Sequence, residues 1–116
     1  MRKDDLIRLR HMLDAAREAT GFAQGKTMPD LATDRMLTLS LVKAIEIIGE
    51  AASKVTKECQ DAHPDVPWQD IVAMRNRLIH AYFDINLGIL WNTVVQDLPP
   101  LIATLETIVS SAENDE

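Results

Sequence analysis

Several features are missing from this sequence, and each absence excludes a class of protein. The single cysteine, Cys59, cannot form an internal disulfide. No uninterrupted apolar run approaches the roughly 20 residues that a membrane-spanning helix needs. The opening segment Met1–Asp5 carries acids where a signal peptide would need an apolar stretch. We therefore expect a cytoplasmic protein that does not cross a membrane.

Positive charge is also in short supply. The sequence has 12 lysines and arginines against 18 aspartates and glutamates, which gives a formal net charge of -6. Affinity for phosphate comes from Lys and Arg side chains that displace counterions, so this balance argues against a protein that coats nucleic acid through bulk positive potential. Any contact with RNA must be local, made by a basic patch on an acidic body.

The rest of the composition, 47% hydrophobic and 26% charged, is typical of a soluble globular protein. We interpret the 116 residues as one domain over residues 1–116. This length is near the lower end of the sizes that fold comfortably without disulfides, metals or a partner chain. We therefore expect one hydrophobic core, which a partner chain could complete.

Apolar residues recur at helical spacing along most of the chain. A first helix is predicted over about residues 4–24. Asp30 or Thr33 is the predicted cap of a second helix, the longest, which runs toward Cys59 or Gln60. The first half of the chain should therefore fold as two helices.

The second half of the chain continues this pattern. A third helix is predicted to start near Trp68 and to end between Ile79 and Phe83, and Asn86 is the predicted cap of the next helix. Pro99-Pro100 should force a break or a sharp kink before a final amphipathic helix. Because no strand-like alternation or internal repeat is found, the predicted fold class is all-α, an antiparallel bundle of four to five helices.

The second predicted helix is apolar on more than one face. One stripe contains Leu41 and Ile45, while Val42 and Ile47 lie off it. Such a helix should be covered on two sides, and small residues in the segment Gly49–Ser53 would let another helix approach closely. Since a chain of this size has few elements with which to cover both sides, we interpret this pattern as evidence for a homodimer.

The densest polar cluster lies in one short segment, formed by Arg75, Asn76, Arg77, His80 and Tyr82. Cleavage of RNA without a metal needs a group that moves protons at the ribose 2′-hydroxyl or the leaving oxygen near neutral pH. It also needs cations that stabilise the charge developing on the phosphate. Histidine and arginine supply these two functions, so the segment is a candidate RNA-cleaving site.

The spacing sets a condition on this interpretation. On an unbroken helix, Arg75 and His80 would point roughly 140° apart and would be separated by about 7.5 Å along the axis. They can act together only if the helix ends before His80, or if a second subunit brings another copy of the segment near. The alternative is that His80 caps a helix C-terminus and that Arg75 is a solvated or ion-paired surface residue.

The segment Arg75–Tyr82 resembles the R-x4-H-x-Y motif of HEPN domains, specifically those of the HepT branch, and the arginine, histidine and tyrosine all match in place. The segment Ala44–Ala52 resembles the Ile-Gly-Glu-Ala part of that family's long helix, and Pro67-Trp68 resembles the entry to its motif helix. The resemblance covers essentially the whole chain, and the motif is its most specific part.

The resemblance implies an all-α homodimer whose two motifs face a shared cleft. It implies a metal-independent endoribonuclease, without a cofactor, that acts on tRNA or mRNA as the toxin of a type VII-like toxin-antitoxin system. The implied antitoxin is an MntA-like nucleotidyltransferase that adenylylates Tyr82. By the same resemblance, His80 transfers protons, Arg75 stabilises the phosphate, and Asn76 is a supporting polar contact.

Two other hypotheses remain open for the whole chain. It could be a non-catalytic helical HEPN module that binds or regulates a nucleotidyltransferase, or a structural dimerisation bundle in which the motif caps a helix. Smaller alternatives also remain open within the site. Glu46 or Glu50 could orient His80, or could form surface pairs with Lys43 or Lys54.

Three further features have simple structural interpretations. The C-x3-H spacing of Cys59 and His63 lacks a second ligand pair nearby, so a zinc site is not expected. Trp68 and Trp91 fall in apolar helical patterns and are predicted to be core or interface anchors. His11 stands among Arg8, Arg10 and Arg17 and forms either a mild basic strip or a solvated face.

Overall fold

The computed structural model describes residues 1–81 and 84–115, and their side chains except at positions 75 and 79–81. Its architecture is all-α, as predicted. The longer helices are α1 (Lys3–Ala23), α3 (Arg35–Ser53), α5 (Trp68–Leu78) and α7 (Leu98–Asn114). The shorter elements are α2 (Asp30–Thr33), α4 (Lys57–Ala62), β1 (Ile79–Ala81), β2 (Asp84–Ile85), α6 (Leu87–Asn92) and the π-helical segment η1 (Thr93–Asp97).

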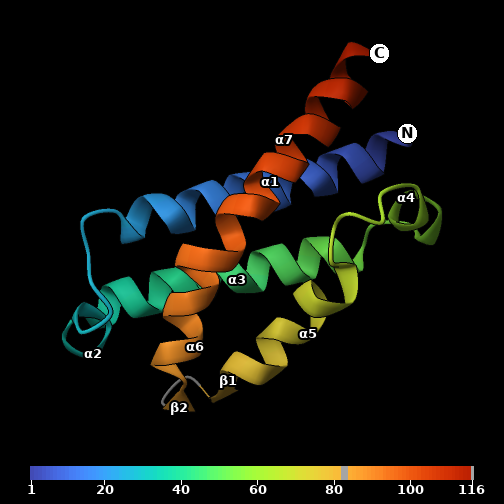
Figure 1. The fold of residues 1–116 in the computed structure, drawn as a ribbon. Helices are drawn as coiled ribbons and strands as arrows, with labels where there is room; N and C mark the ends of the chain where they lie inside the picture. The colour runs from blue at the N-terminus through green and yellow to red at the C-terminus, as the bar shows by residue number, and fades with distance from the viewer. Residues whose placement is uncertain (82–83, 116) are drawn as a thin grey trace.

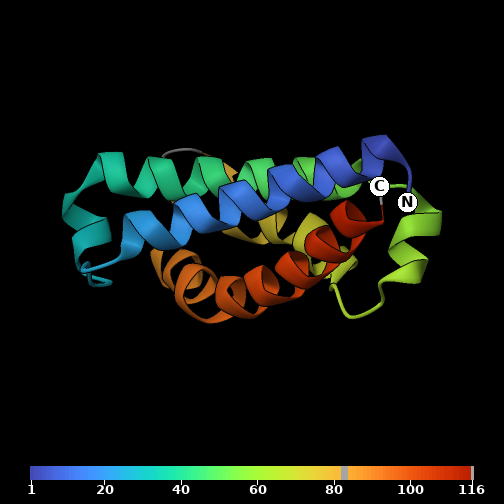
Figure 2. The ribbon, with the colours of Figure 1, turned by 90° about the horizontal axis from the view of Figure 1, so that it is seen from above.

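The bundle is built around α1 and α3, which lie antiparallel and side by side (Figure 1). α7 packs against α1, and α5 packs against α3. The two chain termini lie together at one end of the bundle, and α2, β1 and β2 lie toward the other end (Figures 1 and 2). The C-terminal end of α5 is therefore placed away from the termini.

The buried hydrophobic residues form one continuous cluster. Leu9 and Met12 of α1 and Leu41 and Ile48 of α3 are all fully buried in it. α1 also buries four alanines, whose small side chains allow its neighbours to pack closely: Ala15, Ala16, Ala19 and Ala23. Helical spacing of apolar residues thus produces the expected single core.

One carboxylate is buried together with this core. Asp5 is 2% exposed, and its Oδ1 accepts a hydrogen bond from the backbone N–H of Thr56 at 2.9 Å. Its Oδ2 accepts a second bond from the Thr56 hydroxyl at 2.7 Å. These bonds satisfy the buried carboxylate and join the first turn of α1 to the connection between α3 and α4.

The predicted start of the second helix was wrong. α2 is a short, separate helix, and Asp34 rather than Asp30 or Thr33 caps α3. The Asp34 side chain accepts a hydrogen bond from the backbone N–H of Leu37 at 3.1 Å. Asp30 accepts instead from the backbone N–H of Thr27 at 2.7 Å, so its carboxylate supports the preceding turn.

The predicted end of the same helix was also wrong. α3 ends at Ser53 rather than near Cys59, and Thr56 caps the separate helix α4. The interruption buries Val55, which is 4% exposed, and brings Thr56 to Asp5. A helix continued to Cys59 would tie up the backbone N–H that Thr56 donates to Asp5, so the tertiary contact and the break occur together.

The chain stays helical at Pro99-Pro100, but the helix changes from π-helical to α-helical type just before them. The π-helical segment η1 connects α6 to α7, and the flanking residues Asn92 and Leu98 keep α-helical backbone angles. Both Pro99 and Pro100 fall in the first turn of α7. Proline is tolerated in the first turn of an α-helix, because its fixed φ suits the helix.

The small residues of α3 are covered within the chain itself. Gly49 is buried, and a Cβ added to it would lie 3.6 Å from the backbone carbonyl oxygen of Ile71 on α5. Ala51 and Ala52 are 5% and 0% exposed. Since α1 and α5 both pack on α3, its small residues are accounted for without a second copy and give no support for a dimer.

Candidate active site

α5 carries the first residues of the candidate segment and is held by one apolar face. Ile71, Met74 and Leu78 recur at intervals of three and four residues, and all three are buried. Asn76 and Arg77 lie on the same helix and are exposed. The helix therefore presents polar side chains to solvent from a backbone that the core fixes in place.

α5 ends at Leu78, just before the predicted interval from Ile79 to Phe83. His80 consequently lies in β1 and not on the helix. The backbone N–H of Asn86 donates to the carbonyl oxygen of Leu78 at 3.2 Å, which satisfies one of the last carbonyls of the helix. The helix thus ends before His80, so the 140° separation calculated for an unbroken helix does not apply.

A short antiparallel pair of strands follows α5, and the sequence pattern did not predict it. Ile79 is paired with Ile85, and Ala81 with Asp84. Asn86 then caps α6, as predicted, by accepting a hydrogen bond from a backbone N–H at 3.0 Å. The segment is therefore bounded by a packed helix on one side and a capped helix on the other.

The structure places the four candidate residues to different extents. Asn76 is exposed on α5. The backbones of Arg75 and His80 lie in α5 and β1, while their side chains are outside the described part of the chain. Tyr82 lies entirely outside the described residues. The backbones of Arg75 and His80 thus lie on either side of one helix-to-strand junction. The chemical roles of all four side chains stay predictions.

The two acids of the long helix differ in exposure. Glu50 forms an ion pair with Lys54, with 3.1 Å between its Oε1 and the lysine Nζ. Both side chains are about half exposed, at 57% and 50%, so the pair contributes little to stability. Glu50 thus forms the surface ion pair with Lys54 that was one of the two alternatives for it. Glu46 is half-buried on the same helix.

The two tryptophans pack as predicted. Trp68 is buried at the start of α5, and its indole N–H donates to the backbone carbonyls of Gln60 and His63 at 3.2 and 3.0 Å. Trp91 is partly buried against the core. Trp68 therefore anchors the N-terminal end of α5 to the α4 region.

The Cys59 thiol is buried in the core. Burial raises the pKa of this thiol, and the nearby Asp5 carboxylate adds to the rise, so the thiol is held in its protonated form. Among the side chains that the structure describes, which do not include that of His80, no three His, Cys, Asp or Glu are placed to hold a metal ion together. Across residues 1–81 and 84–115, no helix is both long and apolar enough to traverse a membrane.

Comparison with known proteins shows a match to the family model described as Ribonuclease HepT-like, over residues 12–108. A provisionally named RNase of Caldanaerobacter subterraneus subsp. tengcongensis is 36% identical over 101 residues, which cover 87% of this chain and 90% of that protein. The probable ribonuclease HepT of Thermococcus cleftensis is 37% identical over 79 residues, covering 68% of this chain and 72% of that protein. No solved structure matches the chain significantly.

Proposed function

The chain belongs to the HepT-like ribonuclease family, and from this membership we propose that it is a metal-independent endoribonuclease. Arg75, His80 and Tyr82 form its R-x4-H-x-Y motif. The observation that carries the proposal is the coincidence of this complete motif with similarity to proteins named as ribonucleases over most of the chain. The end of α5 at Leu78 is compatible with this proposal. His80 lies in β1, so the 140° separation from Arg75 on an unbroken helix does not apply.

The proposed reaction is an internal transesterification. His80 takes the proton of a ribose 2′-hydroxyl as the 2′ oxygen attacks the adjacent phosphorus. The bond from phosphorus to the 5′ oxygen breaks, and that oxygen leaves with a proton supplied by the second histidine of a dimer. The products are a 2′,3′-cyclic phosphate and a 5′-hydroxyl. Arg75 stabilises the charge that builds up on the phosphate oxygens.

This chemistry favours a homodimeric enzyme in which two copies of the segment share one cleft. One histidine in its neutral form accepts a proton while another in its charged form donates one, so two copies of His80 meet both needs. Asn76, which is exposed within the motif segment, supplies a further polar contact. The dimer is thus part of the proposed mechanism and not only of the proposed assembly.

Purified wild-type protein, shown by mass spectrometry to carry no AMP, should cleave RNA in the presence of EDTA. We expect cleavage because neither proton transfer nor charge stabilisation in this mechanism requires a metal. The measurement is incubation with tRNA and with mRNA, followed by mapping of the new ends. Absence of cleavage on both substrates by an AMP-free protein would favour the binding-module hypothesis instead.

We further propose that a nucleotidyltransferase antitoxin silences the enzyme by adenylylating Tyr82. In this reaction the tyrosine oxygen attacks the α-phosphorus of ATP, pyrophosphate leaves, and the hydroxyl proton is lost to solvent. The attached AMP adds bulk and negative charge close in sequence to Arg75 and His80. The AMP phosphate would pair with the Arg75 guanidinium and would repel the phosphate of an incoming RNA.

Adenylylation of Tyr82 should therefore lower cleavage by on the order of a hundredfold, which corresponds to about 2.7 kcal/mol of lost transition-state stabilisation. The measurement combines an MntA-like nucleotidyltransferase, ATP and the purified chain, with the AMP adduct located by mass spectrometry before cleavage is assayed. Tyr82→Phe is the matched control, since it lacks only the hydroxyl and should stay unmodified under the same treatment. An AMP adduct on Tyr82→Phe, or full cleavage by the Tyr82 adduct, would contradict the proposed switch.

The second candidate function is a non-catalytic module that positions or regulates a nucleotidyltransferase. The acidic net charge favours it, because a chain of formal charge -6 has little general attraction for RNA. The complete arginine, histidine and tyrosine set favours the enzyme, because a scaffold has no need of all three. Cleavage in EDTA distinguishes the two, since only the enzyme produces new RNA ends.

A further inference from the structure

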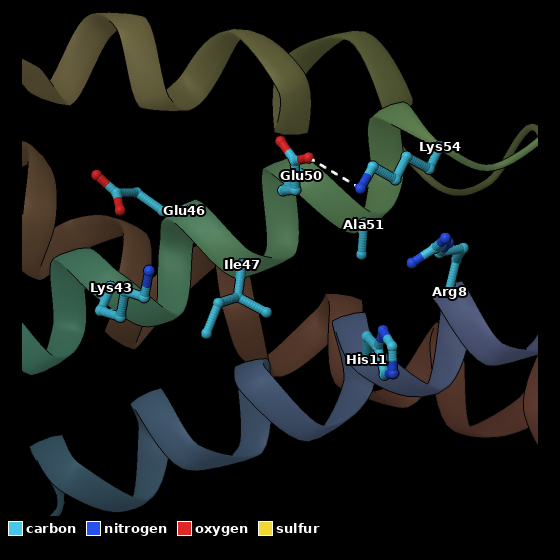
Figure 3. A pocket seen from close by; sticks show the side chains of 8 residues that line it. All are labelled: Arg8, His11, Lys43, Glu46, Ile47, Glu50, Ala51 and Lys54. Carbon is cyan, nitrogen blue, oxygen red and sulfur yellow. Dashed lines mark ion pairs between the residues drawn. The ribbon is translucent and has the colours of Figure 1, made fainter.

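A groove lies between α1 and α3, lined by residues outside the motif segment (Figure 3). Its volume is about 290 Å³. Arg8 and His11 of α1 border it, opposite Lys43, Ile47 and Lys54 of α3. Because Glu46 and Glu50 also line it, the groove has a small formal excess of positive charge on a protein that is acidic as a whole.

The cations of α1 fall into two groups. Arg10 pairs with Glu113 of α7 at 3.6 Å, and Arg17 pairs with Glu106 of α7 at 3.2 Å. Arg8 lies two residues from Arg10, which turns it about 200° around the helix, onto the side that faces α3. One face of α1 thus has its arginines neutralised by α7, and the other face does not.

The groove carries a net positive charge within the part of the chain that the structure describes. Glu50 engages Lys54, but within residues 1–81 and 84–115 the structure records no ion pair for Arg8 or Lys43. The lining holds three Lys and Arg side chains against two Glu, so its formal charge is positive even with His11 neutral. A ligand that neutralises this charge should be an anion.

The arrangement of the cations favours an extended anion. Lys43 lies at one end of the groove, while Arg8 and Lys54 lie at the other, with Ile47 and His11 between (Figure 3). Lys43 and Lys54 are separated by about 16 Å along the axis of α3. One phosphate group cannot reach both ends, whereas a chain of phosphates can.

The groove also runs toward the candidate active site. α5 runs antiparallel to α3 (Figure 1). Gly49 of α3 lies opposite Ile71 of α5, since a Cβ on Gly49 would be 3.6 Å from the Ile71 carbonyl oxygen. Six residues toward the N-terminus of α3, or about 9 Å, place Lys43 level with the C-terminal end of α5. An RNA strand that follows the groove past Lys43 would therefore approach the end of α5, where the motif lies.

We propose that the groove between α1 and α3 binds the backbone of the RNA substrate at a distance from the scissile bond. Arg8 and Lys43 contact phosphates, and the exposed His11 ring offers a surface on which a base can stack. The proposal rests on the proposed ribonuclease function and explains how a chain of net charge -6 holds RNA. Binding depends on a local basic groove, and the acidic remainder of the surface limits contact elsewhere.

The test compares two double variants in the His80→Ala background, in which bulk tRNA should stay intact during binding. Arg8→Gln with Lys43→Gln removes the two unpaired cations of the groove. We expect binding of tRNA to weaken on the order of tenfold at about 50 mM salt. The slope of log K against log salt should fall by about 1.4 to 1.8, which corresponds to two lost phosphate contacts.

Arg10→Gln with Arg17→Gln is the matched control, because it removes the same charge from the α7 side of α1. It should leave the slope within experimental error of the His80→Ala parent. Equal changes in slope for the two double variants would overturn the proposal, because only overall charge would then matter. Absence of tRNA binding by the parent would overturn it as well.

A second measurement separates the groove from other occupants. The side chains replaced in the two double variants are exposed or half-buried. Circular dichroism should therefore match that of the His80→Ala parent, and light scattering should give the same mass for each variant. A change of mass in Arg8→Gln/Lys43→Gln without a change in salt slope would show that a second copy of the chain occupies the groove, and would refute the RNA assignment.

The groove and the catalytic motif can fail independently of each other. If the groove variant shows a smaller salt slope for tRNA binding while His80→Ala leaves cleavage intact, the groove proposal is supported and the catalytic role of His80 is refuted. If His80→Ala abolishes cleavage while the groove variant binds tRNA like its parent, the ribonuclease function is supported and the groove proposal is refuted.

Discussion

Replacement of His80 by alanine is expected to lower RNA cleavage in EDTA by about 10³-fold while the protein stays folded. In the proposed mechanism this side chain transfers the proton of the attacking 2′-hydroxyl, and no other residue of the motif titrates near neutral pH. The backbone of His80 lies in β1, after the end of the packed helix α5. The measurement is the initial rate of cleavage of tRNA, with the rate of the uncatalysed reaction subtracted.

His63→Ala provides the matched control. His63 is one of the other two histidines of the chain, and the contact recorded for Trp68 uses its backbone carbonyl, which the substitution preserves. Cleavage by His63→Ala should match the wild type within about twofold, because the proposed chemistry does not use its ring. An equal loss in both variants would point to a general defect of folding.

The same experiment separates the enzyme from the structural dimerisation bundle. If His80 only caps a helix or lines an interface, His80→Ala should cost on the order of 1 kcal/mol of stability and change nothing else. Unfolding in urea, at matched protein concentrations, measures that cost. Loss of cleavage with an unchanged midpoint and mass would support the catalytic role.

Asp5→Ala should lower the free energy of unfolding by about 3 kcal/mol. The substitution removes a carboxylate that is 2% exposed and accepts two hydrogen bonds from Thr56. The Thr56 N–H and hydroxyl would then lose their acceptors at a partly buried site, and bonds to a charged acceptor are the stronger ones. The measurement is the urea midpoint, at one protein concentration and with an unchanged slope of the transition.

Asp4→Ala is the control for this prediction, because Asp4 lies in the same first turn of α1 and is exposed. It loses a similar interaction with the helix dipole but no buried contact, so its cost should stay below about 1 kcal/mol. Asp5→Asn should fall between the two, since it keeps one acceptor oxygen. If Asp4→Ala and Asp5→Ala cost the same, the bonds to Thr56 would not be the source of the stability.

The sequence predicted those parts of the fold that depend on local periodicity. The limits of α1, the start of α5 near Trp68 and the cap at Asn86 all follow from residues within a few positions of each boundary. The membership in the HepT-like family was likewise visible in a short contiguous motif. Tertiary packing leaves these features unchanged, because the interactions that produce them are made within one or two helical turns.

The errors share a different physical cause. The second helix was predicted to run unbroken to Cys59, yet it ends at Ser53 because Thr56 turns to Asp5, a residue 51 positions earlier in the chain. The small residues of α3 were predicted to let another helix approach closely, and the helix that does so at Gly49 is α5 of the same chain. A local sequence pattern does not predict which distant segment of the chain will pack against a helix face.

The same distinction applies to function. The sequence alone determined the all-α class, the candidate residues Arg75, His80 and Tyr82, and the requirement that any RNA contact be local. Tertiary structure alone decided that α5 ends before His80, and that Arg8 and Lys43 border one groove while Arg10 is neutralised by α7. Motifs are contiguous and can be read along the chain, whereas ion pairs and grooves depend on which helices pack together.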